Sequence, residues 1–104
     1  MTKRILFDII YAMNYYIYNF KVFDNNKGKL HLKKLFCDAY AESRNEAQRQ
    51  IVDKMLAPDG RIGQFITPND PFDRFRLVFD DEPLVEDEVI WNEELNQWEW
   101  AIPH

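Results

Sequence analysis

The stretch YYIYNFKVFDNNKGKLHLKKLFCDAYA, residues 15–41, decides the fold because it contains two strand-like runs with a turn between them. In the first run, aromatic or β-branched residues occupy every second position: Tyr16, Tyr18, Phe20 and Val22. That period is typical of a β-strand with one buried face. Asn and Gly in DNNKG, residues 24–28, tolerate the positive φ of a turn. The stretch therefore predicts an antiparallel hairpin, and a β-bulge at Lys33–Lys34 would restore the alternation of its second strand.

A helix is predicted directly after this hairpin. Ser43 and Glu46 have the S-x-x-E spacing of a capping box, in which Ser43 accepts from the Glu46 amide and Glu46 reaches back to the Ser43 amide. The following turns carry one apolar stripe: Ala47, Ile51, Val52, Met55 and Leu56. Arg49 and Asp53 are four residues apart and predict an ion pair on the exposed side. Pro58 and Gly60 end the helix, which therefore spans about 43–57.

Two further strand signals lie in the second half of the chain. RFRLVFD, residues 74–80, places Phe75, Leu77 and Phe79 on one face of a strand, and Pro83 then bars a central position in a sheet. EVIW and WEWAI flank the polar run NEELNQ, 92–97, which predicts a terminal hairpin. Its aromatic side is formed by Val89, Trp91, Trp98, Trp100 and Ile102. We interpret this side as the inner face of the sheet and the intervening acids as its outer face.

The first segment, residues 2–14, fits either a helix or a strand. Its apolar residues recur at helical spacing, but they also alternate as in a strand. The helix is favoured because no turn residue separates this segment from the next run. The sequence predicts a single α+β domain over 1–104, with a small antiparallel sheet of four to five strands, the helix at 43–57 on one face and a further helix at the N-terminus.

Charge is distributed unevenly along the chain. Residues 1–68 hold eleven Lys/Arg and seven Asp/Glu, a balance of +4, whereas residues 69–104 hold two Lys/Arg and eleven Asp/Glu, a balance of −9. Residues 80–100 contain nine carboxylates, all three tryptophans and no Lys or Arg. Such asymmetry indicates an electrostatic partner or self-association.

The acidic segment predicts a non-catalytic interaction protein. Carboxylates on a rigid sheet imitate the charge spacing of a nucleic-acid backbone, so we expect the partner to be a protein with a basic surface that handles nucleic acid. Small inhibitors from bacteriophages and mobile elements share this size and composition, and a nucleic-acid mimic or host modulator of that type is the specific expectation. The expected contact residues are Asp80, Asp81, Glu82, Glu86, Asp87, Glu88, Trp91, Glu93, Glu94, Trp98 and Trp100.

Two alternatives use the basic first hairpin. Its lysines lie among tyrosines, which is typical of single-stranded nucleic-acid binding: Lys21, Lys27, Lys29, Lys33 and Lys34. The same basic hairpin could instead contact the acidic tail of another copy, which predicts a self-associating subunit and a homo-oligomer.

Sequence signals for catalysis, cofactors and metals are lacking. His31 and Cys37 are six residues apart on one predicted strand, about 20 Å at strand rise, which is too far for a catalytic dyad. The acids lack the spacing of a calcium loop, and no glycine-rich phosphate loop occurs. Polar residues interrupt the apolar N-terminal run, so we expect no membrane span. The single Cys37 cannot form an internal disulfide, which fits a cytoplasmic protein.

Overall fold

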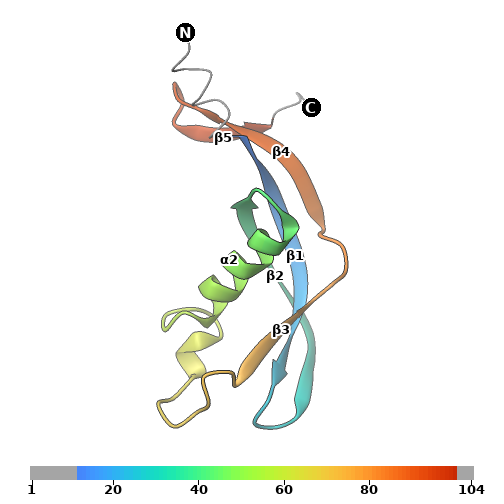
Figure 1. The fold of residues 1–104 in the computed structure, drawn as a ribbon, viewed down its shortest axis with the longest axis vertical. Coiled ribbons are helices and arrows are strands. Elements are labelled where there is room, and N and C mark those ends of the chain that lie inside the picture. The colour runs from blue at the N-terminus through green and yellow to red at the C-terminus, as the bar shows by residue number, and fades with distance from the viewer. Residues whose placement is uncertain (1–11, 101–104) are drawn as a thin grey trace.

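The computed structural model describes residues 12–100, an elongated body of 56 × 27 × 20 Å (Figure 1). It confirms the predicted α+β fold, with five antiparallel strands and one α-helix in the described part. In chain order the elements are β1 (Ala12–Asp24), β2 (Lys29–Ala41), α2 (Arg44–Leu56), the 3-10 helix η1 (Gly63–Phe65), β3 (Phe75–Phe79), β4 (Val85–Asn92) and β5 (Gln97–Trp100).

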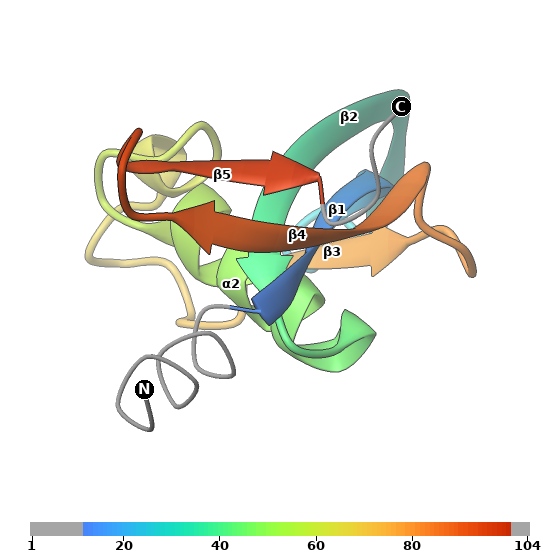
Figure 2. The same cartoon turned by 90° about the horizontal axis from the view of Figure 1, so that it is seen from above.

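β1 is the central strand of the sheet. One of its edges pairs with β2 along almost its whole length, from Asn14↔Ala41 to Asp24↔Lys29. Its other edge is shared, because β4 pairs with the first half of β1 and β3 with the second half. β5 returns antiparallel to β4, and this hairpin lies nearest to the viewer when the molecule is seen from above (Figure 2). Both predicted hairpins are therefore confirmed.

The predicted β-bulge is also present. Phe20 lies opposite Leu35, whereas Val22 lies opposite His31, so the register shifts by two residues around Lys33–Lys34. A shift of two residues leaves the parity of β2 unchanged, so it does not restore the alternation as predicted: Leu30 lies opposite Phe23, on the other face from Leu35 and Cys37. The face of β1 that carries Phe20 is mostly apolar, and the buried Asp24 lies at its end.

α2 covers that face of the sheet and forms the core with it. Tyr16, Tyr18, Phe20 and Val22 are at most 7% exposed and pack in one cluster with the buried residues of α2: Ala47, Ile51 and Met55. The predicted alternation of buried positions is thus confirmed for β1, and Leu77 of β3 extends the cluster. We call this side of the sheet the covered face.

The N-terminal cap of α2 forms only in part as predicted. The Ser43 hydroxyl accepts from the Glu46 amide at 3.2 Å. The Glu46 carboxylate, however, lies 3.6 Å from Arg49 instead of returning to Ser43. The predicted Arg49–Asp53 pair is therefore wrong, because Arg49 turns toward the negative charge one turn earlier. After the helix, a Cβ at Gly63 would overlap the carbonyl oxygen of Ala57, so the close return of the chain requires glycine.

The helix interpretation of the N-terminal segment is wrong for residues 12–14, which belong to β1. Asn14 pairs with Ala41 on one side and with Glu88 on the other, so two ladders hold this part of the chain extended. The rest of that prediction, from residue 2 to residue 11, lies outside the described residues.

The interpretation of the tryptophan side as the inner face is also wrong. Val89 and Trp91 do share a side with Trp98 and Trp100, as predicted, because they are direct cross-strand neighbours. The pairing of β4 with β1, however, places this side on the face opposite α2. Alternation along a strand separates two faces, but only the register with β1 decides which one the helix covers. Ile102 lies outside the described residues.

Candidate functional site

Five aromatic rings cluster on the sheet face opposite α2, and we call this cluster the aromatic face: Tyr15, Tyr40, Trp91, Trp98 and Trp100. Tyr40 stacks on Trp98 with ring centroids 5.3 Å apart, and Trp91 meets Trp98 edge-on at the same distance. Trp100 meets the edge of Tyr15 at 6.1 Å. These cross-strand ring contacts fasten the β4–β5 hairpin to β1 and β2.

The rings leave an open groove of about 680 Å³ between them. Tyr40 is 37% exposed and Trp100 is 46% exposed, so both present apolar surface to solvent. Tyr15 forms one wall, and its hydroxyl donates to the Asp38 carboxylate at 2.9 Å. Burial, with that carboxylate, raises the pKa of Tyr15 to about 12, so the phenol stays neutral at pH 7. The groove is large enough to hold a side chain or a short peptide segment.

A second hollow, of about 660 Å³, lies around the turn of the same hairpin. Three carboxylates line it, which we call the acidic rim: Glu93, Glu94 and Glu99. Ile90 also lines this hollow and is 40% exposed. An apolar floor beside three negative charges fits a ligand that carries positive charge on an apolar stem, such as a Lys or Arg side chain.

The β4–β5 turn is held by a hydrogen bond within the turn, which leaves its acidic side chains exposed to solvent. The Asn92 side chain accepts from the Leu95 amide at 3.1 Å, and Asn96 adopts a left-handed φ of 53°. The turn residues between Asn92 and Gln97 are all exposed, and Leu95 is 59% exposed. The tip therefore combines two carboxylates with an exposed apolar side chain.

Three of the predicted contact acids are already paired within the chain. Lys34 lies 2.8 Å from Asp80. Arg44, at the start of α2, donates to both carboxylate oxygens of Glu86 at 3.0 and 2.8 Å and lies 3.0 Å from Glu82. The hydrogen bonds from Arg44 hold the pKa of Glu86 below its ordinary value. These acids fasten the 80–86 segment to β2 and α2, and Lys34 and Arg44 offset two of their three negative charges.

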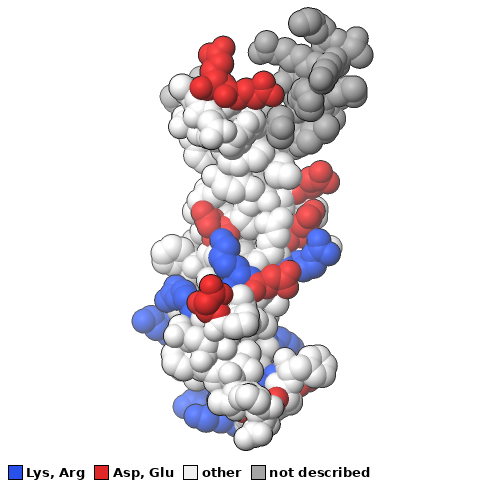
Figure 3. All heavy atoms as spheres, turned by 90° about the vertical axis from the view of Figure 1, so that its left-hand side faces the viewer, with Lys and Arg blue, Asp and Glu red and all other residues white. Residues whose placement is uncertain are grey.

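The other five predicted contact acids have no ion pair within residues 12–100: Asp81, Asp87, Glu88, Glu93 and Glu94. Asp87 lies on the side of the aromatic face, directly opposite Tyr15, whereas Glu88 lies on the covered side, opposite Asn14. Among the described residues, the view from the left of Figure 1 shows red carboxylates at the β4–β5 end, both charges mixed in the middle, and mainly blue Lys and Arg toward the other end (Figure 3). Four of these five acids thus lie on the β4–β5 hairpin, where they are spread over both faces of the sheet and the turn.

Three residues of this site were not predicted: Tyr15, Tyr40 and Glu99. Tyr15 and Tyr40 belong to the first hairpin, and only the long-range pairing of β1 with β4 brings them beside the tryptophans. Their strand parity could have shown that they lie opposite the buried positions, but not what they contact.

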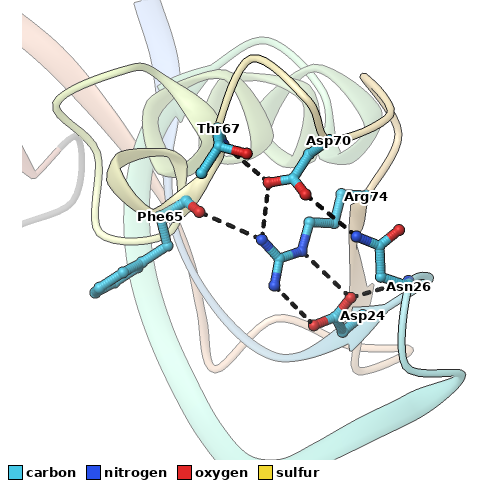
Figure 4. Close-up of polar contacts among 6 residues, drawn as sticks. All are labelled: Asp24, Asn26, Phe65, Thr67, Asp70 and Arg74. Atoms are coloured by element: carbon cyan, nitrogen blue, oxygen red, sulfur yellow. Dashed lines mark hydrogen bonds and ion pairs between the residues drawn. The ribbon is translucent and has the colours of Figure 1, made fainter.

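The other end of the molecule is organised around Arg74 (Figure 4). Its guanidinium lies 3.3 Å from the Asp24 carboxylate and 2.9 Å from that of Asp70, and it donates to the Phe65 carbonyl at 3.3 Å. Asn26 closes the network, since its amide donates to Asp24 and its side chain donates to Asp70. The network ties the β1–β2 turn to the 57–74 connector.

Asp24 is the buried charge of this network, at 2% exposed. Burial alone raises its pKa, but the hydrogen bonds from Arg74 and the Asn26 amide together hold the pKa below its ordinary value. The pKa of Asp70 is also lowered, first by the hydrogen bond from the Thr67 amide and then by Arg74. The three charged groups satisfy one another, so we assign this network a structural role.

Next to this network lies a groove of about 450 Å³, which we call the basic groove. Lys27 and Lys33, both predicted as nucleic-acid contacts, line it. Of the other predicted lysines, Lys34 is paired with Asp80, while Lys21 and Lys29 are not among its lining residues. The structure therefore brings together only two of the five.

In the described residues, His31 and Cys37 do not meet, and no group of metal ligands is found. His31 lies opposite Val22 and Cys37 lies opposite Tyr18, at separate places along β2. Between residues 12 and 100, no three His, Cys, Asp or Glu side chains are grouped as metal ligands would be. Over the same range, no helix has the length and apolar character needed to cross a membrane.

No protein-family model, curated protein or solved structure matches this chain. Any function must therefore be inferred from the fold and from the geometry of the two ends of the molecule.

Proposed function

We propose that this chain is a non-catalytic binding protein whose β4–β5 end docks on a cationic surface of another protein. The observation that carries the proposal is the concentration of uncompensated carboxylates beside partly exposed tryptophans at one end of the molecule. A Lys or Arg side chain in the hollow would meet the acidic rim and the face of an aromatic ring, and a cation–π contact contributes about 0.5–2 kcal/mol. The negative end would also speed association with a basic partner at long range.

The specific version of the proposal concerns the nature of the partner. A protein that handles nucleic acid has a basic groove, and a ligand with carboxylates and flat rings can compete for it with phosphates and bases. We therefore propose an inhibitor of the kind made by bacteriophages or mobile elements, acting in the cytoplasm. Asp80, Glu82 and Glu86 form ion pairs within the chain. The carboxylates that would imitate phosphates are therefore those of the hairpin: Asp87, Glu88, Glu93, Glu94 and Glu99.

Tryptophan fluorescence provides a direct test, because all three tryptophans lie on β4 and β5. The probe is an octa-arginine peptide, titrated into the full chain at low and at high salt. We expect a saturable change in tryptophan emission that weakens with salt. The variant Glu93→Gln/Glu94→Gln/Glu99→Gln should bind about tenfold more weakly, since it loses three charges at the rim.

The matched control removes three exposed acids elsewhere, with Asp53→Asn/Asp59→Asn/Asp73→Asn. Equal affinity of the rim variant and this control would show that the rim is not the contact surface. The inhibitor version is tested separately: duplex DNA bound to a basic DNA-binding protein should be displaced by the wild-type chain but not by the rim variant.

A further inference from the structure

The basic groove carries a net positive charge that ion pairs within residues 12–100 do not neutralise. Four cations and one carboxylate line it, which gives +3 with His31 neutral. Arg74 and Asp24 compensate each other in the buried network. Lys27, Lys33 and Arg61 are exposed and have no ion pair within residues 12–100, so they are the available charges.

The floor of this groove is apolar. It is formed by the side chains of Val22, Leu35, Ile62, Phe65 and Phe75. Phe65 is 63% exposed, so its ring is open to a ligand. A cationic rim over an apolar floor fits a ligand that combines carboxylates with a large apolar side chain, and it disfavours a fully hydrated anion.

The β4–β5 hairpin has that composition. Leu95 is 59% exposed and Trp100 is 46% exposed, and both lie beside the acidic rim, whose three carboxylates match the +3 of the basic groove. The hairpin cannot reach the groove of its own chain, because the two lie at opposite ends of a body 56 Å long (Figure 1). We propose that the basic groove binds the β4–β5 hairpin of a second copy of this chain.

The arrangement of charge favours a closed antiparallel dimer. In Figure 3, one side of the molecule shows carboxylates at one end and Lys and Arg toward the other. Two copies related by a two-fold axis across this side would place each hairpin against the other copy's basic groove. The hairpin is also the surface assigned under the proposed function, so self-association and partner binding exclude each other.

Sedimentation velocity of the full chain tests the dimer. At low salt, the mass should rise from the 12.6 kDa monomer toward twice that value as concentration increases, and about 0.5 M salt should reverse the change. Two charge-reversal variants, Lys33→Glu/Arg61→Glu and Glu93→Lys/Glu94→Lys, should each remain monomeric because like charges then face each other. Mixed in equal amounts, they should associate again, since both contacts regain opposite charges. The control Lys29→Glu/Arg49→Glu makes the same charge change outside the groove and should dimerise like wild type.

A wild-type chain that stays monomeric at low salt, or a mixture that fails to associate, would overturn the proposal. So would a single-stranded oligonucleotide that binds the monomer and is lost in Lys33→Glu/Arg61→Glu, since the groove would then be a nucleic-acid site. The proposed function is tested by a different measurement, the binding of octa-arginine. Lys33→Glu/Arg61→Glu keeps the hairpin intact, so it should still bind octa-arginine even where it no longer dimerises.

Discussion

The two ends of this molecule use charge in opposite ways. Around Arg74, the acids Asp24 and Asp70 are held by a guanidinium and by backbone amides, so charge fixes a turn to a connector. At the β4–β5 end, Glu93 and Glu94 face solvent without an ion pair in the described structure. The same residue types therefore stabilise the fold at one end and remain available for binding at the other. The two roles differ because the acids near Arg74 are paired with a cation and those of the hairpin are not, although the residue types are the same.

The largest effect should come from breaking the compensated end. Arg74→Ala leaves the buried Asp24 carboxylate without its cation, and removing one partner of a buried pair is strongly destabilising. We expect the Tm to fall by about 10 °C or more, measured by circular dichroism or calorimetry. Arg44→Ala is the matched change at exposed pairs and should lower the Tm by only a few degrees. Equal losses in the two variants would mean that burial does not distinguish the ends.

Acid should weaken the compensated end selectively. Asp24 and Asp70 have lowered pKa values in the folded chain, so the stability that they contribute is complete above their unfolded pKa and is lost as the pH falls through the folded values. The free energy of unfolding should decline between about pH 4 and pH 2. Urea titrations across this range should show a shallower decline for Asp24→Asn than for wild type. Parallel curves would assign the acid sensitivity to other groups.

The smallest effect is expected at the boundary between the two ends. Among residues 12–100, the buried Tyr18 hydroxyl finds no hydrogen-bond partner, so Tyr18→Phe should leave stability unchanged or raise it by up to about 1 kcal/mol. The Tyr15 hydroxyl, by contrast, donates to the Asp38 carboxylate at 2.9 Å, and Tyr15→Phe should cost about 1 kcal/mol. Denaturant titration of both variants measures the difference. A loss in Tyr18→Phe as large as that in Tyr15→Phe would reveal a hydrogen bond to the Tyr18 hydroxyl.

The sequence predicts those parts of the fold that depend on neighbours along the chain. The alternation before the DNNKG turn, the bulge at Lys33–Lys34 and the Ser43 cap are local, and the structure contains all of them. The placement of the tryptophans was predicted wrongly because it depends on which residue of β1 meets Glu86, a contact between strands about seventy positions apart. A period of two defines two sides of a strand, and only the tertiary register assigns one of them to the helix.

The same limit applies to the two candidate surfaces. Acids and tryptophans concentrated in 80–100 could be predicted from composition, but the sequence does not show that Lys34 and Arg44 compensate Asp80, Glu82 and Glu86. The basic groove was predicted only through Lys27 and Lys33. Arg61, Ile62, Phe65 and Arg74 come from the 57–74 connector, where no regular period indicates which side chains face the sheet.

Cys37 carries the single thiol of the chain, and its reactivity can report how often the core under α2 opens. It is 8% exposed within the cluster beneath α2, so an alkylating reagent should react with it faster when the helix separates from the sheet. The labelling rate of the unmodified protein therefore counts these openings. If tryptophan emission from the β4–β5 hairpin is recorded in the same sample, the opening rates of the two halves of the molecule can be measured independently.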